Sequence, residues 1–209
     1  MGKILLINGS PRSKSCTYTA LREVADTLEK NGVETELIEI GTKPVAGCIA
    51  CGKCWETGKC IFDDDAVNRI SAKLDEYDGI VVGSPVYYAG PSGQICAFLD
   101  RLFYSSGGRM AGKIGAAVVS CRRGGASAAF DRLNKYFQIS NMVVASSQYW
   151  NQVHGNTPDE VRQDAEGMQT MRTLGQNIAW LVKSIEAGRQ AGVEAPAYES
   201  KIATNFIRK

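Results

Sequence analysis

The sequence lacks several features that assign a chain to a common class. No apolar run is long enough to cross a bilayer, and the chain does not open with a basic segment followed by an apolar core. The 24 basic and 22 acidic residues nearly balance, and they form no long block of one sign. We therefore expect a cytoplasmic protein with neither nucleic acid nor a membrane as its partner.

Two common nucleotide-binding motifs are also missing. The sequence contains neither the G-x-x-x-x-G-K-[ST] of a P-loop nor the G-x-G-x-x-G of the dinucleotide fold. Histidine is almost absent, with His154 as the only one, and no side chain stands out as a strong general base. The 209 residues fit one domain with additions, and they contain no internal repeats.

What the sequence does contain is an alternation of short apolar strands with amphipathic helices. Five strands are expected, at residues 4–7, 33–40, 79–82, 114–120 and 142–145. A long final helix is expected to follow Thr157, which can act as the N-cap before a proline at the first helical position. This alternation predicts a doubly wound parallel sheet, whose ligand site lies beyond the carboxyl ends of its strands.

The loop after the first strand is rich in hydroxyl groups. A sharp turn at residues 8–11 leads past Arg12 into a helix that begins at about Cys16. Free amides and the positive end of the helix dipole face an anion at such a point. Together with Arg12 and backbone amides, four hydroxyls could surround one phosphate monoester: Ser10, Ser13, Ser15 and Thr17. The alternative is an ordinary turn whose hydroxyls cap the helix.

Cysteine is the most informative residue type. The chain has seven, an odd number, which fits a thiol or metal role in a reducing compartment better than a disulfide framework. Four of them form a C-x2-C-x2-C-x5-C pattern: Cys48, Cys51, Cys54 and Cys60. A ferredoxin loop wraps a cubane cluster with thiolates at this spacing. Structural zinc and a redox-active dithiol are alternatives. Zinc ribbons, however, usually separate their two C-x-x-C pairs more widely, and a redox-active C-x-x-C usually opens a helix, whereas this loop follows a strand.

Taken together, these motifs resemble the iron-sulfur flavoproteins within the NADPH-dependent FMN reductase superfamily. The resemblance rests on GSPR at residues 9–12, SPVY at 84–87, SG at 92–93, DR at 100–101 and the cysteine loop. It covers nearly the whole chain. It implies a flavodoxin-like three-layer α/β/α sandwich with five parallel strands in the order 2-1-3-4-5, carrying FMN at the carboxyl edge.

The resemblance also implies roles for particular residues. In the first loop, the FMN phosphate would be held by Ser10, Arg12, Ser13, Ser15, Cys16 and Thr17. The isoalloxazine ring would be wrapped by Pro85, Val86, Tyr87 and Tyr88. Its other edge would be closed by Ser120, Arg122 and Gly125. Arg122 or Arg123 would bring positive charge to the flavin and favour its anionic reduced form.

For the cysteine loop, the resemblance leaves two readings. In the iron-sulfur flavoproteins the four cysteines bind a [4Fe-4S] cluster that exchanges electrons with FMN. In many other chains of the superfamily, such a loop only covers the flavin with thiols. All four cysteine positions match the cluster motif.

The expected activity is that of an FMN-dependent oxidoreductase. One version moves electrons between a redox protein, the cluster and FMN. The alternative takes hydride from NAD(P)H and reduces a small molecule such as a quinone, nitro or azo compound. A non-catalytic flavodoxin-type carrier and a redox-sensing binding protein are further alternatives, but flavodoxins are usually strongly acidic and this chain has a net charge of +2.

The expected organisation is a single FMN-binding domain with an extension. Residues 1–187 would form the domain, with the cysteine-rich loop at residues 44–62, and residues 188–209 would follow without a core pattern. Within this extension, Ile202, Phe206 and Ile207 could pack on a neighbouring subunit, so we expect a homodimer or homotetramer. A loop near the fifth strand supplies three expected substrate contacts: Trp150, Asn151 and His154.

Overall fold

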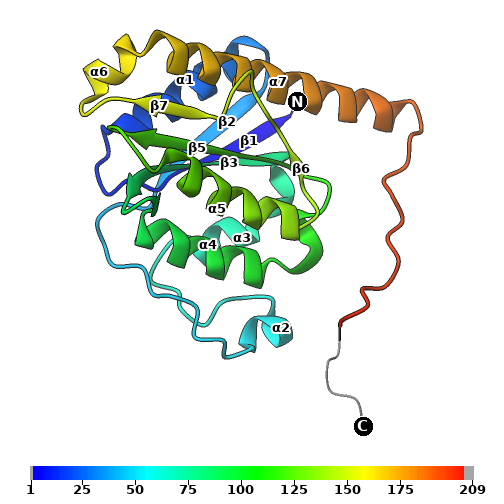
Figure 1. Cartoon of the computed structure of the whole chain (residues 1–209). Coiled ribbons are helices and arrows are strands. Elements are labelled where there is room, and N and C mark those ends of the chain that lie inside the picture. Colours follow the sequence, from blue (N-terminus) through cyan, green and yellow to red (C-terminus); the bar gives the residue numbers. More distant parts are fainter. Residues whose placement is uncertain (1, 205–209) are drawn as a thin grey trace.

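The apolar run near the start of the chain forms strand β1 (Lys3–Asn8), which lies inside a parallel sheet. The structure is a computed structural model, and it describes residues 2–204. Helices cover both faces of the sheet, so that the domain has three layers (Figure 1). The predicted flavodoxin-like α/β/α architecture is confirmed.

The sheet has the predicted order of its main strands. Along the sheet lie β2 (Glu34–Glu39), β1, β3 (Gly79–Tyr87), β5 (Ile114–Cys121) and β6 (Val143–Val144). All four neighbouring pairs are parallel. In the numbering of the five predicted strands, this is the order 2-1-3-4-5.

The described residues contain seven strands rather than five. Strand β4 (Gly90–Pro91) pairs with β3 in an antiparallel hairpin, and β7 (Gln152–His154) pairs with β5 in parallel. The predicted fifth strand at residues 142–145 shrinks to the two residues of β6. The chain then leaves the sheet and returns as β7, beside the carboxyl half of β5.

The helices form one layer on each face of the sheet (Figure 1). One layer consists of α1 (Cys16–Lys30), α6 (Pro158–Gln163) and α7 (Ala165–Gln190). The other consists of α3 (Val67–Ala72), α4 (Gly93–Ser105) and α5 (Ala126–Ile139). Two short 3₁₀ turns, Leu74–Glu76 and Gly107–Met110, lie beside the second layer, and α2 (Lys53–Thr57) lies in the cysteine loop.

The expected single final helix is in fact two helices. Thr157 does cap a helix, since its hydroxyl accepts a hydrogen bond from the Glu160 amide, but that helix is α6 and it ends at Gln163. Asp164 then starts α7 by accepting a hydrogen bond from the Gly167 amide. The second cap was not expected because Asp164 lies inside an otherwise continuous helical pattern.

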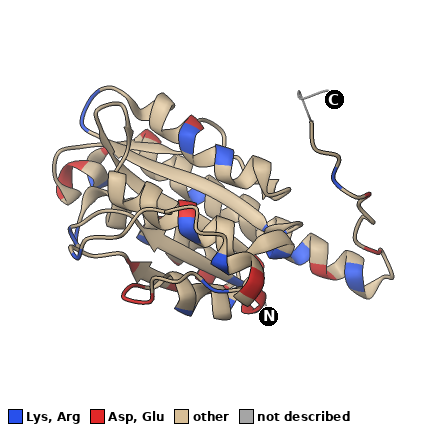
Figure 2. Ribbon diagram, turned by 90° about the horizontal axis from the view of Figure 1, so that it is seen from below, with Lys and Arg blue, Asp and Glu red and all other residues tan. Residues whose placement is uncertain are grey.

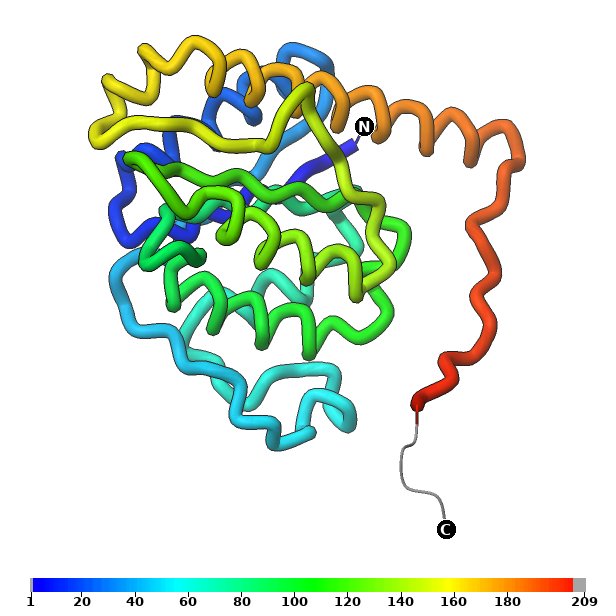
Figure 3. Tube along the Cα trace, in the orientation of Figure 1, coloured from blue at the N-terminus to red at the C-terminus, as the bar shows by residue number. Residues whose placement is uncertain are grey.

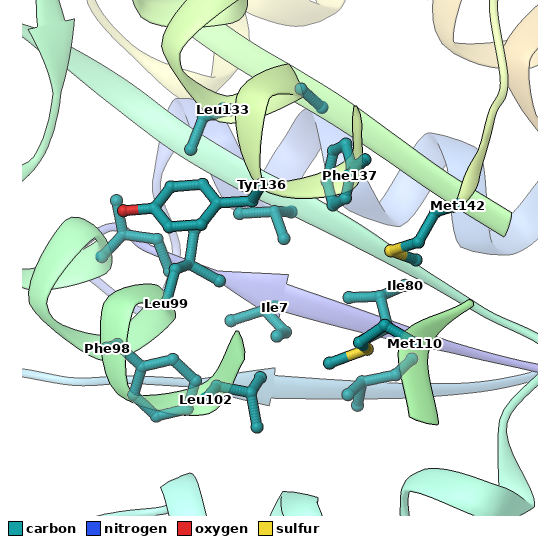
Figure 4. Packing of buried hydrophobic residues seen from close by; sticks show 14 of the residues in the cluster. Ile7, Ile80, Phe98, Leu99, Leu102, Met110, Leu133, Tyr136, Phe137 and Met142 are labelled. Carbon is teal, nitrogen blue, oxygen red and sulfur yellow. The ribbon is translucent and has the colours of Figure 1, made fainter. Parts of the chain in front are cut away.

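The core consists of two apolar layers, one on each side of the sheet. Ile4 and Leu6 of β1 pack with α1 and α7, whereas Leu5 and Ile7 face the other way, towards α3, α4 and α5. Figure 4 shows part of the second layer, where side chains of α4 and α5 meet the sheet. Because β1 is buried on both faces, its sequence is continuously apolar rather than alternating.

After Gln190, where α7 ends three residues past the expected domain boundary at 187, the chain runs away from the body of the domain (Figures 1 and 3). Residues 191–204 are all exposed and contain no helix or strand. Phe206 and Ile207 lie outside the described residues. Basic and acidic residues are interspersed along the ribbon (Figure 2). Within residues 2–204, no helix is both long and apolar enough to span a bilayer.

Candidate functional site

Four parallel strands end side by side at one edge of the sheet, which we call the carboxyl edge. The pairing aligns Asn8 of β1 with Gly83 of β3, and Pro85 of β3 with Ser120 of β5. On the far side of β5, Cys121 is aligned with His154 of β7. The loops predicted to bind a cofactor therefore meet at this edge, as expected for an open α/β sheet.

The loop after β1 is held in a tight turn by its own groups. The Gly9 amide donates to the Gly83 carbonyl at 2.8 Å, and the Ser10 amide donates to Asn8 Oδ1 at 3.1 Å. A Cβ atom on Gly9 would lie 2.7 Å from the Gly83 carbonyl oxygen, so the close approach of β1 and β3 requires glycine here. The Arg12 amide donates to Ser10 Oγ at 3.2 Å. These contacts fix the backbone that leads into α1.

The residues predicted to surround the phosphate fall into two groups. Ser15 Oγ accepts a hydrogen bond from the Tyr18 amide at 3.1 Å, which makes Ser15 the N-cap of α1. Thr17 is buried, and its hydroxyl lies 2.8 Å from that of Ser120. Arg12 and Ser13, in contrast, are exposed beside the start of the helix. Ser15 and Thr17 therefore hold the loop in place, while Arg12 and Ser13 are free to meet an anion.

One buried donor in this region has no partner. Asn8 Nδ2 is buried and makes no hydrogen bond within the described part of the chain. Buried polar groups are usually paired, so an unpaired one at a ligand edge calls for an explanation. The free donor, the exposed Arg12 and the positive end of α1 together fit the phosphate of FMN.

The segment after the middle of β3 is a hairpin rather than a loop. Strand β3 continues to Tyr87, and a two-residue turn at Tyr88 and Ala89 leads into β4. Both turn residues have positive φ angles, 49° and 59°, which is the backbone of a type I′ turn. Each costs about 1–2 kcal/mol in a residue other than glycine. Tyr87 is about half exposed and Tyr88 is fully exposed, so both rings are free to contact a flavin.

The loop after β5 packs against this hairpin. Gly125 has a φ of 89°, and a Cβ atom there would lie 2.7 Å from the Ala89 Cα. The contact helps to explain how the strained turn is held. Arg122 and Arg123 are both exposed and lie just before α5, so their charges add to the positive end of that helix.

The three expected substrate contacts lie in different environments. Asn151 is buried, its Nδ2 donates to the Ala117 carbonyl at 3.0 Å, and its Oδ1 accepts from Ser147 Oγ at 2.7 Å. Its side-chain amide therefore ties the segment before β7 to β5. Trp150 is half exposed and packs on Tyr149, with ring centroids 4.6 Å apart, and His154 is exposed.

The four predicted cluster cysteines line one pocket. The loop that carries them runs along the outer side of α4 (Figure 3), and the pocket is closed by Arg101 and Tyr104 of that helix. Cys54 Sγ lies 4.0 Å from the Tyr104 carbonyl oxygen, near the last turn of α4. All seven cysteines are free thiols. The chemistry of this donor set, four thiols facing one space, fits an iron-sulfur cluster.

The pocket is not at the carboxyl edge. Ser92, just before α4, belongs to that edge because its hydroxyl donates to the Gly9 carbonyl at 2.8 Å. Tyr104 lies twelve residues further along the helix, which corresponds to about 18 Å at the usual helical rise. Within one chain, the pocket formed by the cysteine loop therefore lies away from the predicted flavin site.

The thiols of the pocket influence one another. Burial raises the pKa of the Cys54 thiol, and neighbouring charge at Cys51, Cys48 and Cys60 raises it further. Bringing four thiolates together therefore requires a positively charged partner. Within residues 2–204, no group of three or more His, Cys, Asp or Glu side chains is arranged so that it could hold a metal ion.

The site contains residues whose roles the sequence did not reveal. Asn8 and the hydroxyl of Ser84, which accepts from the Ser92 amide at 2.9 Å, organise the carboxyl edge. Arg101 is part of the DR motif at residues 100–101, and it lines the cysteine pocket and is fully buried. The signal in the sequence is an adjacent pair of charged residues, Asp100 and Arg101, within an otherwise apolar stretch of helix.

Known proteins resemble the chain in both sequence and fold. The family model of NADPH-dependent FMN reductases matches residues 2–157. An iron-sulfur flavoprotein of Methanocaldococcus jannaschii is 35% identical over 192 residues, which are 88% of this chain and 99% of the relative. Another, of Methanosarcina thermophila, is 29% identical over 191 residues, covering 90% and 98% of the two chains.

Two solved structures share the fold at 17% identity. RosB with bound 8-demethyl-8-formylriboflavin-5'-phosphate has a TM-score of 0.72 and covers 100% of this chain and 95% of its own. The flavodoxin-like WrbA-like protein of Agrobacterium tumefaciens has a TM-score of 0.64, with 88% and 99% covered. These likenesses define a flavodoxin-like domain.

The chain belongs to the NADPH-dependent FMN reductase family and, within it, groups with the iron-sulfur flavoproteins. The resemblance inferred from its motifs is confirmed. The protein is an FMN-dependent oxidoreductase. The individual FMN, cluster and substrate contacts stay predictions.

The buried amide of Asn151 generates a stability prediction. Asn151→Ala should lower the free energy of unfolding by about 1–3 kcal/mol, because the buried Ala117 carbonyl loses its donor. Urea unfolding measures the loss. Asn177→Ala is the matched control, since Asn177 Nδ2 also donates to a carbonyl, that of Ser146 at 2.7 Å, but in an exposed position. Equal losses for the two variants would contradict the structural role assigned to Asn151.

Proposed function

We propose that the protein is an iron-sulfur flavoprotein that moves electrons between a [4Fe-4S] cluster and FMN. The observation that carries the proposal is the pocket on α4, which is lined by all four cysteines of the C-x2-C-x2-C-x5-C pattern. The names of the relatives, which are themselves called iron-sulfur flavoproteins, support it.

The chain's own residues would bind and orient both groups. Arg12, Ser13 and the amides at the start of α1 would hold the FMN phosphate, with Ser10, Ser15, Cys16 and Thr17 shaping the loop. The hairpin residues Pro85 to Tyr88 would lie along the flavin ring, and Ser120, Arg122 and Gly125 would close its other edge. When bound, FMN exchanges hydride or electrons at its ring and a [4Fe-4S] cluster exchanges single electrons.

A second candidate is an NAD(P)H-dependent reductase of a small acceptor. It is favoured by the exposed groups around the carboxyl edge. Tyr87, Tyr88 and Trp150 offer rings to a nicotinamide or a quinone, while Arg122 and Arg123 offer charge to a nucleotide phosphate. In this version, NAD(P)H would be a transient donor and the cysteine pocket would take no part.

We also propose that the chain assembles into a homodimer or homotetramer in the cytoplasm. Several large apolar side chains of α7 and the extension are exposed, including Trp180, Val193 and Ile202. A second copy of the chain would remove them from water. Light scattering should give at least twice the mass of one chain, 22.6 kDa, and the mass of a monomer would exclude the assembly.

The cluster is tested by composition. Protein purified without oxygen should contain one FMN and about four iron and four sulfide per chain, the stoichiometry of a cubane. Cys54→Ser should lose most of the iron and keep the FMN, because the cysteine pocket and the carboxyl edge are separate.

The matched control is Cys96→Ser, which changes a cysteine of α4 outside the loop and should retain its iron. FMN without iron in the wild-type protein would favour the NAD(P)H-dependent candidate, and turnover with NADPH would then be the next assay.

The phosphate site is tested through Arg12. Arg12→Ala should weaken FMN binding about tenfold, since it removes one charge-assisted contact worth roughly 1.5 kcal/mol or more. Flavin fluorescence during titration of the apoprotein with FMN gives the dissociation constant. Arg189→Ala, a change in the last turn of α7, should leave FMN affinity unchanged. Identical affinities for both variants would remove Arg12 from the site.

A further inference from the structure

Arg101 is a charged side chain in the interior. Its side chain is fully enclosed, and it is the one Lys, Arg, Asp or Glu among the buried side chains of residues 2–204. A buried guanidinium is costly unless it is paired and hydrogen-bonded on every side. Arg101 lies in α4 between Leu99 and Leu102, which both belong to the core. The cost of burying a charge at this position therefore needs an explanation.

The guanidinium connects both ends of the cysteine loop to α4. Nη1 donates to the Ala46 carbonyl at 3.3 Å, before the first cysteine, and Nη2 donates to the Phe62 carbonyl at 2.9 Å, after the last one. Both Nη atoms also contact the carboxylate of Asp65, which forms a largely buried ion pair with them.

The remaining N–H group points at a sulfur atom. Arg101 Nε donates to Cys60 Sγ at 3.2 Å. Of the four pocket cysteines, Cys60 is thus the one held by a buried cation, whereas Cys54 Sγ faces a backbone carbonyl at 4.0 Å. A guanidinium keeps its proton in proteins, so the group beside Cys60 is positively charged.

We propose that Arg101 is a positioning residue for the iron-sulfur cluster, which fixes the sulfur of Cys60 and raises the cluster's reduction potential. The inference rests on the proposed function, because it requires that the cysteines hold a cluster. A one-electron reduction adds one negative charge to the cluster and its sulfur ligands. A hydrogen bond and a positive charge at one ligand sulfur stabilise that added charge.

The negative charge of Asp65 has the opposite electrostatic effect on the sulfur of Cys60. Its carboxylate pairs with Arg101 and so reduces the net positive charge that Cys60 experiences. Asp65→Asn keeps the shape of the side chain and an oxygen that can accept from the Val67 amide, as Asp65 Oδ1 does at 2.9 Å. The two substitutions Arg101→Gln and Asp65→Asn thus change the charge next to Cys60 in opposite directions.

The test is a reductive titration of the cluster followed by electron paramagnetic resonance. Arg101→Gln should shift the midpoint potential to more negative values, and Asp65→Asn should shift it to more positive values. Arg109→Gln is the matched control. Arg109 also pairs with an aspartate, Asp75, at 2.8 Å, and donates to the carbonyl of Ser71 at 2.8 Å, but it does not line the pocket. Its midpoint should equal that of the wild type.

Each outcome decides the inference. Shifts of opposite sign support it, because a purely structural role has no reason to move the potential both ways. If Arg101→Gln loses its iron, the sign of the shift in Asp65→Asn decides, and no shift or a negative one overturns the inference. Unchanged potentials in variants that still carry the cluster overturn the role of Arg101 in tuning the potential, but they leave the proposed function standing. A wild-type protein without iron and sulfide overturns the proposed function, and this inference with it.

Discussion

The parallel pairing of β3 with β1 on one side and β5 on the other is the constraint on which the rest of the structure depends. It aligns Asn8 with Gly83 and Pro85 with Ser120, and so it brings three loops from distant parts of the sequence to one edge. A slip by one residue would turn the apolar side chains of β3 to the opposite layer, which the two cores do not permit. The same pairing directs α4 away from the carboxyl edge, with the cysteine pocket near its far end.

The sequence predicts this framework because its signals are local. Residues 4–7, 79–82 and 114–120 are short apolar runs bounded by glycine, proline or polar residues, and such runs leave few alternatives to buried parallel strands. The missed elements depend on contacts instead. The turn at Tyr88 and Ala89 lacks the asparagine-glycine signature of its type, and Gly125 packs against it. Strand β7 is three residues long and is defined by its pairing with β5.

The candidate site shows the same division. The hydroxyl-rich loop and the spacing of the cysteines can be found by inspection of the sequence, since their residue types indicate their chemistry. The role of each individual side chain cannot be found in this way. Whether Ser15 caps a helix, whether Thr17 turns towards Ser120 and whether Asn151 faces inward all depend on tertiary packing. Arg101 is the clearest case, because its partners lie between 36 and 55 residues away along the chain.

The cysteine loop contributes only partly buried side chains to the cores, and this has an evolutionary consequence. None of residues 41–66 is fully buried, although Val45, Cys60 and Ala66 pack against one core and the segment connects β2 to α3. A lineage could therefore acquire, shorten or lose this segment without rebuilding the sheet or the carboxyl edge. Loss of the loop would return Arg101 to water, where an arginine needs no partner. One ancestral flavin domain could in this way give rise to descendants that differ in their metal content and hence in the number of electrons they exchange at a time.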